Sequence, residues 1–385
     1  MSVLEKKFTR SYGLNEIALV PSSKTLDIEM VDISVNIANI HLKIPIIASA
    51  MDSVVNPKTA SLIGQLGAGA VLNLEGVQTR YENPDEILSK LTSVDKASYV
   101  PLMQELYQNN PVKPELIIAR IKEIKKASVP CFVSVTPQNA ESLGIIAQEA
   151  GADVLLVQST VVSPDFISKH PERNLDLSAF CRKMKIPVLV GNATTSEVTY
   201  ELMKTGVQGV FIGIGPGAAC TTRGVLGIGV PMASAIARAS EARTRYFQET
   251  GRYVPIIADG GIVNSGDICK ALACGADAVM IGSPFAKSHE APGRGFHWGM
   301  ATPNAVLPRG ARIEVGTIAS LKQILIGPSH SDDGSQNFSG AIATCFATLG
   351  VANISELHDI EVTIAPSLLT EGKIYQKAQQ LGMYK

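Results

Sequence analysis

Eight short apolar runs, separated by helix-like segments, limit most strongly what this chain of 385 residues can fold into. Each run is rich in Val and Ile and is bounded by Gly, Pro, Asn or Asp, which is typical of buried parallel strands. The runs can be taken as four successive pairs: the first with the second, the third with the fourth, and so on. Within each pair the two runs start about 22–24 residues apart, which is the length of one strand–helix unit. The runs cover residues 44–48, 68–73, 130–135, 153–157, 186–190, 208–213, 255–258 and 277–281.

Strands that alternate with helices predict an α/β fold, and eight of them predict a single-domain (β/α)8 (TIM) barrel over residues 1–385. A doubly wound parallel sheet shows the same alternation and is the competing fold. The helices are expected at 57–66, 114–127, 140–150, 195–204, 233–249 and 266–273, with Asn264 or Ser265 as the cap of the last one.

Two regions extend beyond a bare barrel. Residues 79–128 lengthen the second connection, with helices expected at 81–91 and 101–127. Residues 284–340 follow the eighth strand and are too long for an ordinary connection. Long ordered loops are commonly lids or binding loops, so we expect a mobile flap there. A tolerated surface insertion is the alternative.

The composition limits the classes of partner and compartment. Hydrophobic residues make up 45% and charged residues 18% of the chain, which suits buried parallel strands. The net charge of -1 and the lack of a basic run argue against nucleic acid as a partner. The first residues lack a signal-peptide core, no apolar run reaches membrane-spanning length, and the six cysteines are scattered. We therefore expect a cytoplasmic protein that binds neither membranes nor nucleic acid.

A glycine-rich loop after the sixth strand carries a candidate nucleophile. Gly213, Gly215 and Gly217 precede Cys220, and Thr222 and Arg223 follow it. A thiol attacks only as the thiolate, which Arg223 or the amides of the loop would favour. An inert cysteine in a glycine turn is one alternative. Another is the loose dinucleotide pattern of a Rossmann fold, which residues 213–218 match weakly.

Polar groups also follow the other strands, and in a barrel the carboxyl ends of the strands form the active site. Barrels frequently bind phosphate on the loops after strands seven and eight, where glycine N–H groups are exposed. Asp259 is placed to accept hydrogen bonds from a ribose diol, although a turn-capping role is the alternative. Together these features predict a nucleoside monophosphate site. The residues are Ser49, Met51, Gln158, Ser159, Thr160, Asn192, Asp259, Gly261, Gly282 and Ser283.

Three segments resemble the hallmark sequences of the IMP dehydrogenase/GMP reductase family. They are GIGPGAACTTRGVLGIGVP, IADGGIVNSGDICKALACGADAVMIGS and PIIASAMDSV. The resemblance extends in weaker form over nearly the whole chain. It is strongest to an IMP dehydrogenase-related branch that lacks the regulatory CBS pair, because residues 79–128 stand where that pair would be inserted and are too short to hold it.

The resemblance implies NAD+-dependent oxidation of IMP to XMP in guanine nucleotide biosynthesis. Cys220 would form a covalent thioimidate, and Thr222 would position the water that hydrolyses it. It further implies a monovalent cation, K+, on the backbone carbonyls of Gly215, Gly217 and Cys220, and a homotetramer or octamer. The IMP-binding positions would be Ser49, Met51, Asp259, Gly261, Gly282, Ser283, Gly299 and Met300, and the cofactor-binding positions Gln158, Ser159, Thr160 and Asn192.

Several positions depart from the family pattern. The flap lacks the Arg-Tyr pair that activates water, so Arg309 is the candidate for that role; residues 245–246 form such a pair on a helix, which we interpret as an ordinary helix surface. Gln158 replaces an aspartate that usually contacts the nicotinamide ribose, and Ala218 replaces a phosphate-contacting serine. GMP reductase, which uses NADPH, and a non-catalytic purine-nucleotide-binding regulator therefore remain alternatives. The other five cysteines are expected to pack in the core.

Overall fold

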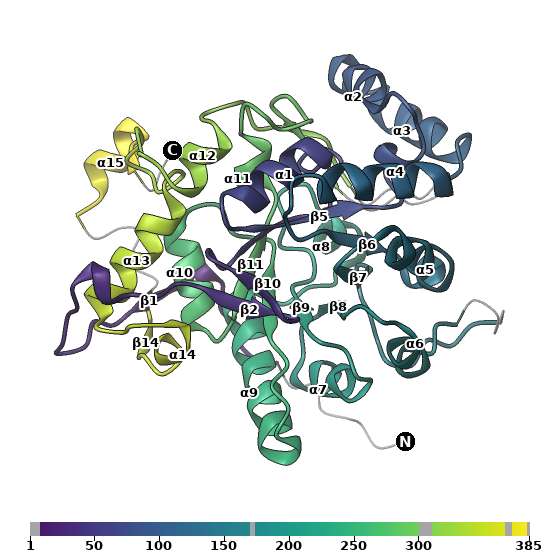
Figure 1. The fold of residues 1–385 in the computed structure, drawn as a ribbon. Coiled ribbons are helices and arrows are strands. Elements are labelled where there is room, and N and C mark those ends of the chain that lie inside the picture. The colour runs from purple at the N-terminus through teal and green to yellow at the C-terminus, as the bar shows by residue number, and fades with distance from the viewer. Residues whose placement is uncertain (1–7, 170–173, 300–309, 366–371, 383–385) are drawn as a thin grey trace, which may run out of the picture.

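The computed structural model describes residues 8–169, 174–299, 310–365 and 372–382. Eight parallel strands close into a barrel, since the last strand pairs with the first (Figure 1). This confirms the predicted (β/α)8 barrel and excludes the open, doubly wound sheet. The barrel strands are β4 (Ile46–Ala48), β5 (Gly69–Asn73), β6 (Phe132–Val135), β7 (Val154–Gln158), β8 (Val188–Ala193), β9 (Val210–Ile212), β10 (Ile256–Asp259) and β11 (Ala278–Ile281).

Each strand is buried on both faces, which explains why the strands appear in the sequence as continuous apolar runs. The short ribbon of β2 (Val35–Ile37) and β3 (Ile40–Leu42) adds Ile37 and Leu42 to the cluster inside the barrel. The polar residues lie at the end of the barrel where the strands finish, at their carboxyl ends. Every strand contributes at least one side chain to the interior: Ile47, Val71, Phe132, Val154, Leu156, Leu189, Phe211, Ile257, Ala278 and Met280.

The six helices predicted to surround the barrel are present, and a further one, α6, lies between β7 and β8. Asn264 caps α10 as expected, since its side chain accepts a hydrogen bond of 2.9 Å from the Asp267 N–H. Within the described part of the chain, no helix is both long and apolar enough to cross a bilayer. These helices are α1 (Pro57–Gln65), α4 (Pro114–Lys125), α5 (Ala140–Ala150), α6 (Leu177–Lys183), α7 (Ser196–Lys204), α9 (Met232–Thr250) and α10 (Ser265–Ala273).

The lengthened second connection forms two helices outside the barrel, α2 (Pro84–Ser93) and α3 (Tyr99–Gln108), before α4 (Figure 1). The helix predicted over 101–127 is therefore wrong as a single element: α3 ends at Gln108, and Pro114 opens α4 at a position that favours proline. The Tyr107 hydroxyl of α3 donates a hydrogen bond to the buried Asp52 carboxylate, which follows the barrel strand β4. The insertion is thus tied to the rim of the barrel.

The described parts of 284–340 pack against the rest of the chain, and the mobile flap expected over this range stays a prediction. Trp298 is buried in one cluster with the α2 and α3 side chains, and Leu321 and Phe338 are buried in the main core. Arg312 lies over the Tyr99 and Phe296 rings and donates to the Leu91 and Val94 carbonyls. The elements here are α11 (Ser283–Ala286), β12 (Phe296–His297), β13 (Ile313–Glu314) and α12 (Leu321–Leu325).

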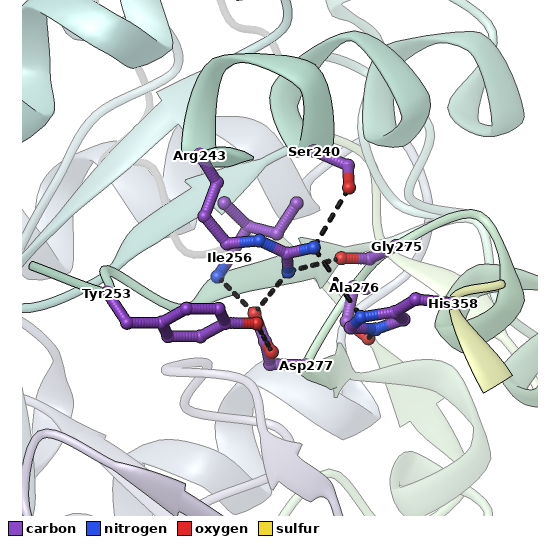
Figure 2. Close-up of polar contacts among 8 residues, drawn as sticks. All are labelled: Ser240, Arg243, Tyr253, Ile256, Gly275, Ala276, Asp277 and His358. Carbon is purple, nitrogen blue, oxygen red and sulfur yellow. Dashed lines mark hydrogen bonds and ion pairs between the residues drawn. The ribbon is translucent and has the colours of Figure 1, made fainter. Parts of the chain in front are cut away.

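The helices of the C-terminal segment, α13 and α14, pack against α10. The strand of this segment pairs antiparallel with the N-terminal β1 (Ile17–Leu19). A buried ion pair, Arg243–Asp277, with Nη1 2.9 Å from Oδ2, lies beside it (Figure 2). The elements of this segment are α13 (Phe338–Leu349), α14 (Ile354–Leu357), β14 (Val362–Ile364) and α15 (Ile374–Gln379).

This ion pair has partners for both charged groups. The Tyr253 hydroxyl donates to Asp277 Oδ1 at 2.5 Å, and the Ile256 N–H donates to Oδ2 at 2.8 Å. The Nε2 of His358 lies 3.0 Å from the Ala276 carbonyl, so Nε2 carries the proton and Nδ1 faces Arg243 as an acceptor, at 3.5 Å. Burial lowers the pKa of His358, which suits a neutral ring beside the guanidinium.

Removing Arg243 should therefore be costly. Arg243→Leu leaves the Asp277 carboxylate buried with only two donors, and loss of one partner of a buried pair typically costs about 3–5 kcal/mol. The matched control is Arg245→Leu on the same helix, whose pair with Glu249 is exposed and should change stability little. Urea unfolding measures the stability of both variants, and equal losses would contradict this account.

Residues 245–246 were predicted to form an ordinary helix surface. The prediction is correct for Arg245, which is exposed, and wrong for Tyr246, which is buried.

Candidate functional site

A cavity of about 490 Å³ opens at the carboxyl ends of the barrel strands. It gathers residues from strands that are far apart in the sequence, as the barrel topology requires. Met300 and Arg309 lie outside the described residues. All other predicted site residues line this one cavity: Ser49, Met51, Gln158, Ser159, Thr160, Asn192, Gly215, Gly217, Cys220, Thr222, Asp259, Gly261, Gly282, Ser283 and Gly299.

The loop between β9 and the short helix α8 (Thr222–Leu226) presents the Cys220 thiol to the cavity. The Cys220 N–H donates to the Gly217 carbonyl at 3.0 Å, which folds the loop back on itself. The thiol donates to the buried Thr222 hydroxyl, with Sγ 3.2 Å from Oγ1. Among the cysteines, all of which lie in described residues, Cys220 is the one that lines the cavity.

The segment that returns after residue 309 runs directly beside this thiol. Gly310 forms an antiparallel bridge with Cys220, and the Ala311 N–H donates to the Ala219 carbonyl at 3.0 Å. Gly299 and Gly310 approach so closely that a Cβ at either one would lie within 4 Å of the other's Cα. Gly299 and Gly310, the described residues on either side of 300–309, therefore both lie at the cavity.

Arg223 does not have the role that the sequence suggested. Its guanidinium donates to the Ile214 carbonyl at 3.3 Å and to the Val230 carbonyl at 2.9 Å, and it does not line the cavity. Its side chain lies against Gly215 and Gly229, where a Cβ would come within 2.7 Å of it. Arg223 thus holds the two ends of the cysteine loop together and is not a counter-ion aimed at the thiol.

Asp259, at the end of β10, forms the polar floor of the cavity. Its Oδ2 accepts hydrogen bonds from Asn192 Nδ2 at 2.7 Å and from Gln158 Nε2 at 2.9 Å. Burial raises the pKa of Asp259 to about 6, and the two amide donors partly oppose this effect. At neutral pH the carboxyl group is therefore ionised but held in a poorly solvated place, which suits an acceptor for hydroxyl groups of a ligand.

The loops after strands seven and eight supply a second, uncharged surface. Gly260 and Gly261 have positive φ and lie against Pro216 of the cysteine loop, where side chains would clash. Gly282 and Ser283 stand at the first turn of α11, whose N–H groups lack partners within the helix. Backbone N–H groups and the Ser283 hydroxyl are the groups that bind a phosphate in such a place.

The sequence analysis missed some residues that line the cavity, notably Thr136 and His297. Thr136 follows the third strand, so the rule applied to the other strand ends would have found it. His297 lies in the segment after strand eight, where no motif or spacing marks it as a site residue. Its Nδ1 is 3.2 Å from the Ser53 hydroxyl, and burial lowers the pKa of His297 to about 4, so the ring is neutral at pH 7.

Asp259→Asn should stabilise the fold, because the amide keeps an oxygen for Asn192 and Gln158 but carries no charge. The folded pKa of Asp259 lies above its ordinary value, so the wild type loses stability as the pH rises through about 4 to 6. Above that window the variant should be more stable by up to about 3 kcal/mol. Thermal melting between pH 4 and 8 measures this difference. A variant that is less stable than the wild type at pH 7 would contradict it.

Comparisons with known proteins agree with this geometry. The model of the IMP dehydrogenase / GMP reductase domain family matches residues 11–302. A protein of Mycolicibacterium smegmatis named an uncharacterized oxidoreductase is 38% identical over 364 residues, 92% of this chain and 96% of its own. An inosine-5'-monophosphate dehydrogenase of Cryptosporidium parvum is 31% identical over 296 residues, 75% of this chain and 71% of its own.

A solved structure from Corynebacterium glutamicum, titled an IMP dehydrogenase/GMP reductase-like protein, superimposes with a TM-score of 0.89. It is 33% identical in sequence, and the match covers 94% of this chain and 96% of that one. The family model spans most of the chain, and the solved structure shares its whole architecture. The chain therefore belongs to the IMP dehydrogenase/GMP reductase family.

Proposed function

We propose that this protein is an IMP dehydrogenase, which oxidises IMP to XMP with NAD+ and water. The observation that carries the proposal is the arrangement in one cavity of a thiol with an adjacent hydroxyl, Cys220 and Thr222, and a carboxylate floor, Asp259. Several relatives are named inosine-5'-monophosphate dehydrogenases, which supports this reaction within the family.

The substrate would lie between the carboxylate floor and the phosphate loops. Asp259 would accept hydrogen bonds from the ribose diol, and Gly261, Gly282 and Ser283 would bind the phosphate. Met51 would then pack beside the purine, with C2 facing the thiol. The remaining proposed contacts of IMP are Ser49, Gly299 and Met300.

Cys220 supplies the nucleophile. Its thiol carries the proton and donates a hydrogen bond to Thr222 Oγ1, so Thr222 is the hydroxyl next to the sulfur when the thiol ionises. The thiolate would attack C2 of the purine, and C2 would lose a hydride. NAD+, when bound, accepts that hydride. Attack of water on C2 would then break the C–S bond, release XMP and return the thiolate, with Thr222 orienting the water; one water proton passes to N3 of the purine and the other to solvent.

The part of the cavity beside Asp259 suits a neutral, hydrogen-bonding cofactor group. Gln158, Ser159, Thr160 and Asn192 are proposed to hold NAD+, and the buried Gln158 Oε1 has no partner among the described residues, which leaves an acceptor for a hydroxyl or carboxamide N–H. The carbonyls of Gly215, Gly217 and Cys220 are proposed to hold K+, for which oxygen ligands are suitable. Assembly as a homotetramer or octamer in the cytoplasm completes the proposal.

A paired turnover assay tests the reaction. With K+ and a reducing agent present, the wild type should form NADH from IMP and NAD+, and it should not consume NADPH with GMP. Cys220→Ser should abolish turnover, because a hydroxyl is a far weaker nucleophile than a thiolate, while IMP still binds by calorimetry. NADPH consumption with GMP would instead indicate a GMP reductase. IMP binding without turnover in either direction would indicate a nucleotide-binding regulator.

Arg309 is proposed to activate the hydrolytic water, since the next residue, Gly310, forms a bridge with Cys220. Arg309→Gln should then retain a first burst of one NADH per site and lose at least about tenfold in steady-state turnover. The covalent adduct on Cys220 should accumulate and be visible by mass spectrometry. Arg294→Gln, an exposed arginine in the same region, is the matched control. Loss of the burst itself in Arg309→Gln would show that this residue acts before hydrolysis.

A further inference from the structure

We propose that Gln158 is a positioning residue for Asp259, which fixes the carboxylate that receives the substrate's ribose. This inference rests on the proposed function and goes beyond it, since the resemblance gives this position only a cofactor contact. The observation behind it is a closed ring of hydrogen bonds among Gln158, Asn192 and Asp259.

The ring uses every amide proton of its two amides. Gln158 Nε2 donates to Asp259 Oδ2 and to Asn192 Oδ1, both at 2.9 Å. Asn192 Nδ2 donates to Asp259 Oδ2 and to the Gly213 carbonyl, both at 2.7 Å. All four contacts are made to acceptors, so neither amide can rotate by 180° without setting oxygen against oxygen. The orientation of both side chains is therefore determined by the network.

The ring leaves the two oxygens of Asp259 in different states. Oδ2 accepts two N–H groups from strands β7 and β8, whereas Oδ1 receives no hydrogen bond from the described residues. Since Asp259 lines the cavity, Oδ1 is the oxygen that can accept from a ligand. The ring thus turns a carboxylate that could rotate into a fixed acceptor, and a fixed acceptor loses less entropy when a diol binds.

Gln158 also contributes an acceptor of its own. Its side chain is only 6% exposed, it lines the cavity, and its Oε1 has no partner among the described residues. A buried carbonyl without a donor is costly, so a bound group with an O–H or N–H would be stabilised there. Asp259 Oδ1 and Gln158 Oε1 are therefore two acceptors attached to one rigid ring, on adjacent ligand subsites.

The ring requires an amide at position 158. An ionised carboxylate there would offer no proton to Asp259 Oδ2 or to Asn192 Oδ1. When the pair of facing carboxylates binds one proton, the two groups share it. Asp259 contacts no charged side chain of the described chain, and the other titratable groups that line the cavity are Cys220 and His297. The hydrogen bond from Gln158 is thus one of the two contacts that stabilise the ionised form of Asp259.

Three variants test the proposal: Gln158→Glu, Gln158→Met and the control Gln148→Glu. Gln148 lies on α5 and its Oε1 accepts two backbone N–H groups, so a carboxylate should be tolerated there. IMP affinity is measured by calorimetry without NAD+ from pH 5 to 8.5. Relative to the wild type at the same pH, Gln158→Glu should weaken binding at least tenfold at pH 8.5, where both carboxylates are ionised, and less at pH 5, where position 158 keeps a proton for Asp259 Oδ2. Gln158→Met should weaken it less, and Gln148→Glu should not change it.

Unchanged IMP affinity of both Gln158 variants at every pH, with a raised KM for NAD+ alone, would overturn the proposal and leave Gln158 as a cofactor contact. If the wild type binds no IMP, the proposed function fails, and melting curves without ligand then decide. The stability that the wild type loses as the pH rises through about 4 to 6 should be lost to a greater extent in Gln158→Met, which removes one donor to the ionised Asp259 and adds no titratable group, and this extra loss should vanish when both proteins carry Asp259→Asn. An extra loss that persists there would overturn the ring.

Discussion

Closure of the barrel is the constraint on which the rest of the molecule depends. The pairing of β11 with β4 brings the ends of eight strands onto one rim, so that Ser49, Cys220 and Asp259 can line a single cavity. Because the interior is filled by side chains from every strand, the rim is also stiff. Polar groups at the ends of the strands, Gln158, Asn192 and Asp259, are then held at hydrogen-bonding distance from one another.

Two buried carboxylates lie at opposite ends of this barrel and are treated differently. Asp277 receives a guanidinium, a phenol and a backbone N–H, so its charge and both of its oxygens have partners within the protein. Asp259 receives two neutral amides on one oxygen only. The first arrangement contributes to stability, whereas the second leaves part of the stabilisation of its charge to a ligand. Such a cost at a binding site is the usual compromise between stability and activity.

The barrel and most of the cavity could be predicted from the sequence because both follow from local rules. A strand buried on both faces is a short apolar run, and the residue after it lies at the rim, which located Asp259, Gln158 and Asn192. What these residues do to one another could not be predicted, since the ring joins three strands and depends on amide orientation. The role of Arg223 could not be predicted for the same reason. Its charge suggested a counter-ion for the thiol, whereas its guanidinium donates to two backbone carbonyls that only the fold brings close. His297 carried no pattern at all.

The contacts of Arg312 and Tyr107 have a consequence for how the molecule opens. Arg312 joins the end of α2 to the β12–β13 ribbon, and Tyr107 joins α3 to Asp52, in the loop after β4 that also carries Ser49 and Met51. Proteins open in cooperative units defined by shared buried contacts, and here the two helices and the ribbon share one apolar cluster around Trp298. We therefore expect the backbone amides of the ribbon to exchange with solvent when α2 and α3 detach, before the barrel itself unfolds. The two helices contribute no residue to the cavity lining, yet their packing would then set how often the rim beside the thiol opens.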